Sequence, residues 1–108
     1  MGSIMIKTKP KAFKAGDIIQ VDAIFEHPME TGLRKDKDGN LIPAYFIKDV
    51  KVEYGSKTVL TMDMTQSVSA NPYVSFNLKV KDGELPLKIT TIDNKSEKSE
   101  KELVIKPS

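Results

Sequence analysis

The sequence contains no cysteine and no tryptophan, and it has one histidine, His27, and one arginine, Arg34. The lack of cysteine excludes disulfides, thiolate metal sites and thiol nucleophiles from this chain. A single histidine without a serine or cysteine motif around it gives little support to a catalytic triad. No glycine-rich loop leads into a helical segment, so the nucleotide-binding fingerprints are missing too. The sequence therefore predicts no catalytic residue, no bound cofactor and no metal.

Long hydrophobic runs are also missing, and none approaches the ~20 residues of a membrane-spanning helix. The stretch from Met1 to Ile6 has no basic region followed by an apolar segment, so no signal peptide is predicted. Residues 1–3 are consistent with a cloning remnant, and the 108 residues fit one domain. Acidic residues are interleaved with the basic ones (15 against 17), which disfavours nucleic acid as a partner.

What the chain does have is hydrophobic residues at every second position. Residues 18–25 place Ile19, Val21, Ala23 and Phe25 on one face. Alternation of this kind predicts strands with one buried face. The predicted strands are 4–9, 18–25, 50–54, 58–64, 73–80, 85–89 and 101–106. About seven short strands in a chain of this length predict an all-β fold, an antiparallel β-sandwich of two sheets.

Turn residues separate the predicted strands. Gly55 and Ser56 predict a tight hairpin, in which Gly55 supplies the positive φ of a type II′ turn. The polar stretch 93–102 is expected to be an exposed turn before the last strand. The longest connection is 27–43, and loops of more than ~12 residues in compact domains are often functional. A small hairpin is expected within it, at residues 38–40.

Imidazole and thioether groups suggest a second interpretation, a periplasmic copper-handling sandwich. His27, Met29, Met62 and Met64 could together form a soft nitrogen and sulfur site. Met62 and Met64, however, lie two residues apart on a predicted strand and share a face. Methionine at such positions more often fills a core or an interface. Copper handling therefore stays the alternative to a binding role.

The long connection and the strand after it resemble SoxZ, a subunit of the bacterial thiosulfate-oxidising Sox system. The resemblance runs through most of residues 18–96. It is carried by the stretches His27–Asp36, Ile42–Ile47, Gly55–Leu60, Asn71–Phe76 and Asp93–Lys95. Tyr45 departs from the pattern, because many members of the family are expected to have histidine there. No role is therefore assigned to a histidine at that position.

The resemblance implies an immunoglobulin-like β-sandwich that is not an enzyme. Proteins of this family pair with SoxY, whose flexible C-terminal tail bears the cysteine that carries sulfur intermediates covalently. The chain is thus expected to scaffold SoxY in a heterodimer and to dock transiently to other Sox enzymes, with no membrane partner. The resemblance further implies a periplasmic location, reached by export with a partner that carries the signal.

Candidate interface residues come from the long connection and the strands near it, because aromatic residues and methionine are enriched in interface cores. Met29 and Leu33 have no evident core to fill, so we expect them at the interface. Glu30 and Arg34 would tie the loop together or pair with a partner. Phe46 is expected mainly in the core. The full set of predicted partner-contact residues is His27, Met29, Glu30, Leu33, Arg34, Tyr45, Phe46 and Tyr73.

Overall fold

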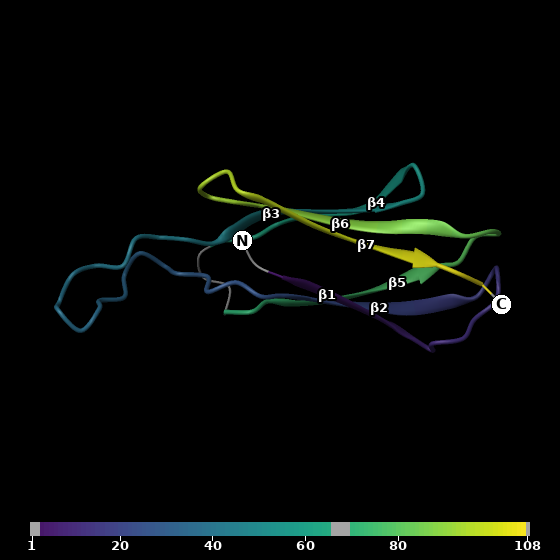
Figure 1. Ribbon diagram of the computed structural model, residues 1–108, viewed down its shortest axis with the longest axis horizontal. Coiled ribbons are helices and arrows are strands. Elements are labelled where there is room, and N and C mark those ends of the chain that lie inside the picture. Colours follow the sequence, from purple (N-terminus) through teal and green to yellow (C-terminus); the bar gives the residue numbers. More distant parts are fainter. Residues whose placement is uncertain (1–2, 66–69, 108) are drawn as a thin grey trace.

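The computed structural model describes residues 3–65 and 70–107. Within these ranges the secondary structure consists of β-strands, with no helix (Figure 1). In chain order they are β1 (Ile4–Lys9), β2 (Ile18–Phe25), β3 (Ile47–Tyr54), β4 (Lys57–Asp63), β5 (Tyr73–Lys79), β6 (Leu85–Asp93) and β7 (Lys98–Ile105). They form two antiparallel sheets that lie face to face, in the orders β1-β2-β5 and β4-β3-β6-β7. The predicted immunoglobulin-like sandwich of about seven strands is confirmed. In the described ranges no helix could cross a membrane.

Two strands extend beyond their predicted ends. β3 begins at Ile47 rather than at residue 50, because an irregularity in its pairing with β6, between Ile47 and Asp49, shifts the alternation of its side chains. β6 continues beyond residue 89, where Thr91 and Asp93 are buried although they are polar. In both places the chain is a strand whose hydrophobic pattern is interrupted, so a period of two does not reveal it.

The prediction of an exposed turn over 93–102 was wrong for most of its length. β7 begins at Lys98, which pairs with Ile92, and its pairing with β6 continues without interruption to Ile105. Lys101 lies opposite the buried Ile89 and so occupies an inward-facing position in the register of the edge strand, although its side chain is exposed. Lys98, Ser99 and Glu100, which the predicted strand 101–106 left out, are all polar, so no hydrophobic alternation marks them as a strand. The turn itself is short, as Asn94 to Glu97 lie between the two strands.

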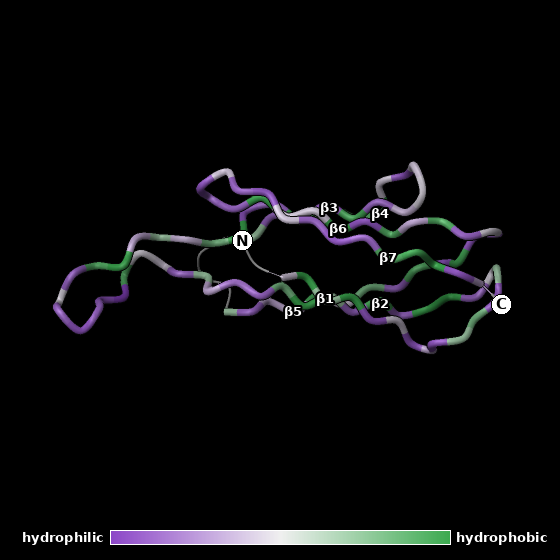
Figure 2. Tube along the Cα trace, viewed as in Figure 1, coloured by the Kyte–Doolittle hydropathy of each residue, from purple (hydrophilic) through white to green (hydrophobic). Residues whose placement is uncertain are grey.

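The hydrophobic core lies between the two sheets and follows the inner faces of β2, β3 and β6. Figure 2 shows hydrophobic stretches along these strands, and their alternation fits the one-sided burial expected of a sandwich. The largest fully buried side chains include Tyr54, Phe25, Ile19, Leu87 and Ile89. The hydroxyl oxygen of Tyr54 accepts a hydrogen bond from the Lys81 N–H at 2.9 Å, which satisfies this polar group at the edge of the core.

The predicted hairpin after β3 is confirmed. Tyr54 pairs with Lys57, so Gly55 and Ser56 form a two-residue turn. Gly55 has a φ of 63°, and Ser56 does not have a positive φ, as a type II′ turn requires.

Residues 28–46 project from one end of the sandwich as a narrow double strand of chain, here called the arm (Figure 1). Its tip is hydrophilic, as Figure 2 shows. The predicted hairpin at the tip is confirmed, because the Gly39 N–H donates to the Asp36 carbonyl at 3.0 Å and the Asp36 N–H donates to the Asn40 carbonyl at 2.9 Å. The protein is accordingly elongated, with extents of 55 × 23 × 17 Å.

Candidate functional site: the arm and its base

Main-chain hydrogen bonds at two places join the outgoing and returning halves of the arm. Near the sandwich, the Glu30 N–H donates to the Tyr45 carbonyl at 2.6 Å, and the Tyr45 N–H donates to the Glu30 carbonyl at 3.0 Å. Farther out, the Ile42 N–H donates to the Arg34 carbonyl at 2.8 Å. Satisfied main-chain groups of this kind give the arm a defined shape rather than that of a loose loop.

A bidentate ion pair fixes the outgoing half. The Arg34 Nε donates to Glu30 Oε1 at 3.0 Å and its Nη2 donates to Oε2 at 2.6 Å. The hydrogen bonds from Arg34 lower the pKa of the Glu30 carboxyl, and the same bonds raise the pKa of Arg34. Of the two roles predicted for these residues, the structure thus shows the one in which they tie the loop together.

Small residues let the two halves of the arm approach each other closely. Gly32 has a φ of 87°, and a Cβ atom built on it would lie 3.2 Å from the Cβ of Ala44. Both the backbone conformation and the limited space therefore favour glycine at this position.

Two asparagines anchor the arm to the sandwich, one on each half. The Asn71 Oδ1 accepts from the His27 N–H at 3.0 Å, and the Asn71 N–H donates to the His27 carbonyl at 2.8 Å. The Asn94 Oδ1 accepts from the Phe46 N–H at 2.8 Å, while its Nδ2 donates to the Ala44 carbonyl at 2.9 Å. Asn71 lies just before β5 and Asn94 just after β6, so segments attached to both sheets contribute to the base of the arm.

His27 lies buried at the base of the arm, with 6% of its surface exposed. Its Nδ1 accepts a hydrogen bond from the Met29 N–H at 3.0 Å, so the neutral ring carries its proton on Nε2. Within the described part of the chain, Nε2 has no hydrogen-bond partner. Burial lowers the pKa of His27, and the nearby carboxylates of Asp93 and Glu97 raise it in partial compensation. The arrangement favours the uncharged imidazole.

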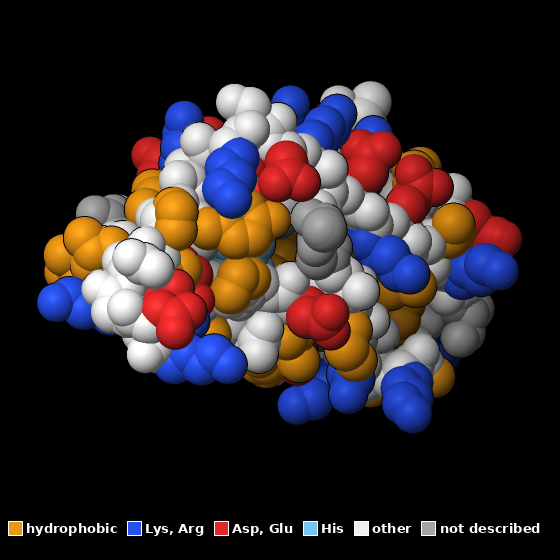
Figure 3. Space-filling model, turned by 60° about the vertical axis from the view of Figure 1, so that its left-hand side comes forward, with side chains coloured by type: hydrophobic (Ala, Val, Ile, Leu, Met, Phe, Trp, Pro, Cys, Tyr) orange, Lys and Arg blue, Asp and Glu red, His pale blue; other side chains and the backbone are white. Residues whose placement is uncertain are grey.

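Tyr45 covers His27 from the outer side. The two ring centroids are 4.4 Å apart and the ring planes meet at 45°. Lys95 Nζ lies 4.4 Å from the centroid of the Tyr45 ring, a cation–π geometry. Figure 3 shows hydrophobic side chains gathered around the pale blue of histidine, with a basic side chain above them. Burial, followed by the charges of Glu97 and Asp93, raises the pKa of Tyr45.

Of the eight predicted contact residues, His27, Glu30, Arg34 and Tyr45 belong to the arm and its base as described above, and the other four differ in exposure. Leu33 is 82% exposed on the arm and Tyr73 is 56% exposed at the start of β5, so both are available to a partner. Phe46 packs against the core, as expected. The argument for Met29 was wrong: the residue has a core to fill, is only 4% exposed, and its sulfur accepts the Ile47 N–H at 3.3 Å.

The contacts at the base of the arm also weigh against the interpretation of the chain as a copper-handling protein. His27 Nδ1 and the Met29 sulfur both accept main-chain hydrogen bonds, which a metal ion would have to displace. Met62 on β4 and Met64 just after its end pack against the core. Among the residues that the structure describes, no three or more His, Cys, Asp or Glu side chains gather as a metal site.

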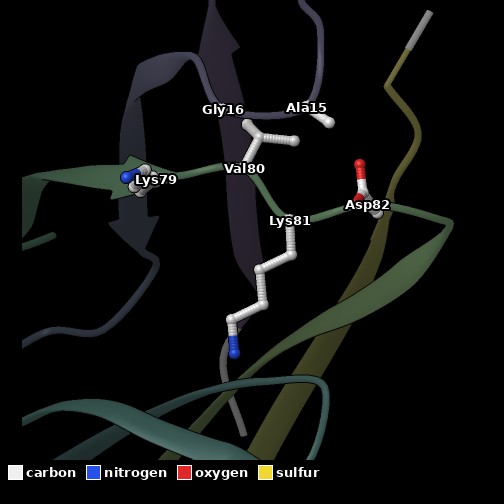
Figure 4. A pocket seen from close by; sticks show the side chains of 6 residues that line it. All are labelled: Ala15, Gly16, Lys79, Val80, Lys81 and Asp82. Carbon is white, nitrogen blue, oxygen red and sulfur yellow. The ribbon is translucent and has the colours of Figure 1, made fainter.

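A shallow depression lies near the turn between β5 and β6. It is lined by Ala15, Gly16, Lys79, Val80, Lys81 and Asp82. The side chains of Lys79, Lys81 and Asp82 point in different directions (Figure 4). Acid–base chemistry needs groups that converge on one reacting atom. This depression is therefore a weaker candidate for a functional site than the base of the arm.

Asn71 and Asn94 are the site residues that sequence reasoning missed. Both lie in stretches that carry the family resemblance, yet each looks like an ordinary turn residue. Four of those five stretches, all except the hairpin stretch Gly55–Leu60, meet at the arm and its base. Their meeting in space is the signal that could have identified the two asparagines.

Comparisons with known proteins give a family and a fold. The profile of a family described as "Sulphur oxidation protein SoxZ" matches residues 6–104. A comparison with curated proteins gave no match. Among solved structures, superoxide reductase (neelaredoxin) from Ignicoccus hospitalis is 19% identical, with a TM-score of 0.72 over 98% of this chain and 80% of that chain. Two variants of that protein, also 19% identical, have TM-scores of 0.71 (98% and 80%) and 0.72 (99% and 81%). At this identity the likeness shows a shared fold alone.

Proposed function

Because the chain belongs to the SoxZ family and is thus a component of the Sox system, we propose that it is the non-catalytic subunit of a sulfur-carrier heterodimer. Its partner is SoxY, whose C-terminal cysteine carries sulfur intermediates during thiosulfate oxidation. The family match over residues 6–104 in a chain without cysteine is the observation that supports this most. A carrier thiol must then come from another polypeptide, since the thiolate is the group that forms the covalent bond.

The construction of the arm suits contact with a partner. Leu33 and Leu41 expose 82% and 59% of their surfaces on a segment that hydrogen bonds hold in shape. Exposed apolar side chains that are already ordered can bind without a large loss of conformational entropy. A swinging cysteine tail needs a rigid body at its base, and a second sandwich beside SoxY would enlarge that body.

The proposed site of action is the periplasm, which the chain would reach by export with SoxY. A fractionation of cells that express both proteins tests this. Recovery of the chain in the periplasm only when SoxY carries its signal supports export as a complex, and recovery that does not depend on SoxY contradicts it.

Co-expression with a SoxY protein tests the pairing itself. We expect a stable heterodimer on a sizing column, and we expect it to persist when the C-terminal tail of SoxY is removed, because the tail must stay free to reach enzymes. Two separate monomer peaks would contradict the proposal. Turnover of thiosulfate by this chain alone would contradict the non-catalytic assignment.

A further inference from the structure

The two sides of the sandwich differ in how they are closed. β1 lies against β7, which brings the edges of the two sheets together. On the opposite side, the described residues of β4 and β5 make no such contact. We call this side, where the β4 and β5 edges are not joined as the β1 and β7 edges are, the open side of the sandwich.

The inner residues along this open side are apolar and only partly buried. Leu60 and Met62 lie opposite the buried Val52 and Val50, which places them on the inner face of β4. They pack against the core together with Met64, Val74 and Phe76. Methionine adapts its shape to different neighbours and is common at contact surfaces.

The β4 edge also lacks the features that usually prevent strands from pairing with other chains. β7 carries an inward-facing lysine, Lys101, and inward-facing charge protects an edge. β4 has no charged residue between Lys57 and Asp63. Its one irregularity, where β3 shifts register between Val52 and Glu53, lies at the hairpin end and leaves the remainder of the edge regular.

Main-chain donors point outward along the regular part of this edge. The Met64 N–H donates to the Lys48 carbonyl at 2.7 Å, toward β3. Because N–H groups alternate in direction along an antiparallel strand, the N–H groups of Thr61 and Asp63 point to the free edge. These donors are available to continue the sheet.

The charges at the edge indicate what an added strand should carry. Asp63 lies opposite Asp49 on β3, and like charges directly opposite each other are destabilising. A basic side chain beside Asp63 would relieve this repulsion. An acidic side chain of the added strand near Lys57 would likewise lie beside an opposite charge.

We propose that the β4 edge receives an extended segment of SoxY, which adds a fifth strand to the four-stranded sheet; this rests on the proposed function. Main-chain hydrogen bonds to Thr61 and Asp63 hold the segment, as in other cases of strand addition. Alternate apolar side chains of the segment cover Leu60, Met62 and Met64. A basic residue of SoxY lies beside Asp63.

Amide hydrogen exchange tests the proposal on the unmodified heterodimer. We expect the amides of Thr61 and Asp63 to exchange rapidly in the free chain and to become protected in the complex by at least about tenfold, because each gains a main-chain acceptor. A heterodimer in which both amides still exchange rapidly would overturn this inference while leaving the pairing with SoxY intact. Failure to form any heterodimer would instead count against the proposed function. If these amides become protected in the free chain because it self-associates, a second copy of this chain occupies the β4 edge, and the proposal of a SoxY segment is overturned.

A proline substitution provides the second measurement. Thr61→Pro removes the outward N–H without removing a hydrogen bond to β3, and edge strands tolerate proline in that orientation. We expect affinity for SoxY to fall by about tenfold or more. Thr8→Pro is the matched control on the β1 edge, where the Glu26 N–H donates to the Ser3 carbonyl and alternation likewise turns the Thr8 N–H away from β2. Equal affinities of the two variants, both folded by circular dichroism, would overturn the assignment of β4.

Discussion

Asn71 satisfies both main-chain polar groups of His27, although the two residues are 44 positions apart in the sequence. Asn71 also has a φ of 50°, a conformation that asparagine adopts more readily than most residues. One side chain thus connects the start of the arm to the segment that leads into β5. Together with Asn94, it ties the base of the arm to the sandwich through contacts between residues far apart in the sequence.

Replacement of Asn71 by alanine should therefore destabilise the fold. Asn71→Ala leaves the His27 N–H without its acceptor and keeps an unfavourable positive φ, so we expect the free energy of unfolding to fall by about 1–3 kcal/mol. Asn71→Gly removes only the hydrogen bond and should cost less. Urea denaturation measures both. Asn77→Ala, an exposed asparagine on β5, is the control and should stay within about 0.5 kcal/mol of the original protein; an equal loss there would contradict the prediction.

The stability of the protein should decrease in mild acid because of His27. Its pKa in the folded protein is lowered by burial, below the value of ~6.5 in an unfolded chain. As the pH falls below about 6.5, the unfolded state takes up a proton and the folded state does not, so the free energy of unfolding falls. Above about 6.5 both states are neutral at this residue and its contribution is complete. Urea denaturation at about pH 7.5 and 5.5 measures the difference.

His27→Gln provides the control for this pH dependence. Glutamine does not titrate, so the variant should show a smaller change in stability between the two pH values. Asp22 does not interfere, because hydrogen bonds from Gln20 and Ser75 lower its pKa to about 2, and its effect is confined to pH values below about 4. The same pH dependence in the variant and the original protein would rule out His27 as its source.

Two glycines of the arm make a matched pair. Gly32 and Gly39 have nearly equal φ values of 87° and 84°, but a Cβ on Gly32 meets Ala44, whereas a Cβ on Gly39 meets nothing within 4 Å. Gly32→Ala should therefore open the arm more than Gly39→Ala, and the arm should become more sensitive to limited proteolysis. Because both variants carry the same backbone strain, the difference between them measures the close approach to Ala44. Equal cleavage rates would show that the contact is unimportant.

Leu33 offers a test of the arm as a contact surface. It is largely exposed, so Leu33→Asp should leave the free energy of unfolding unchanged within about 0.5 kcal/mol. If SoxY covers this side chain, the substitution should weaken the heterodimer by about tenfold or more, measured by calorimetric titration. Val104→Asp, at an exposed hydrophobic residue on β7, is the control. Unchanged affinity of the Leu33 variant would remove the arm from the interface.

The sequence predicted the fold well wherever side-chain direction follows a regular period. The predicted bounds of β2 match the structure, because Ile19, Val21, Ala23 and Phe25 all face the core. β7 was predicted too short because its first three residues, Lys98 to Glu100, are all polar and show no hydrophobic alternation. Local pattern thus identifies central strands better than edges.

The candidate site was less predictable because long-range contacts build it. Met29 looked like a loop residue in the sequence, and only the return of the chain at Ile47 gives its sulfur a buried position and a donor. Asn71 and Asn94 likewise act on residues 44 and 48 positions away. Sequence spacing cannot reveal such partners, whereas the Glu30–Arg34 pair, four residues apart, was foreseen.

The absence of tryptophan gives the three tyrosines a practical value, since they supply the intrinsic fluorescence of the protein. Each one monitors a different region: Tyr45 stacks at the foot of the arm, Tyr54 is buried between the sheets, and Tyr73 is exposed beside the open side of the sandwich. Phenylalanine substitutions, one at a time, would therefore resolve arm opening, global unfolding and partner docking as separate optical signals, with no dye attached to the chain.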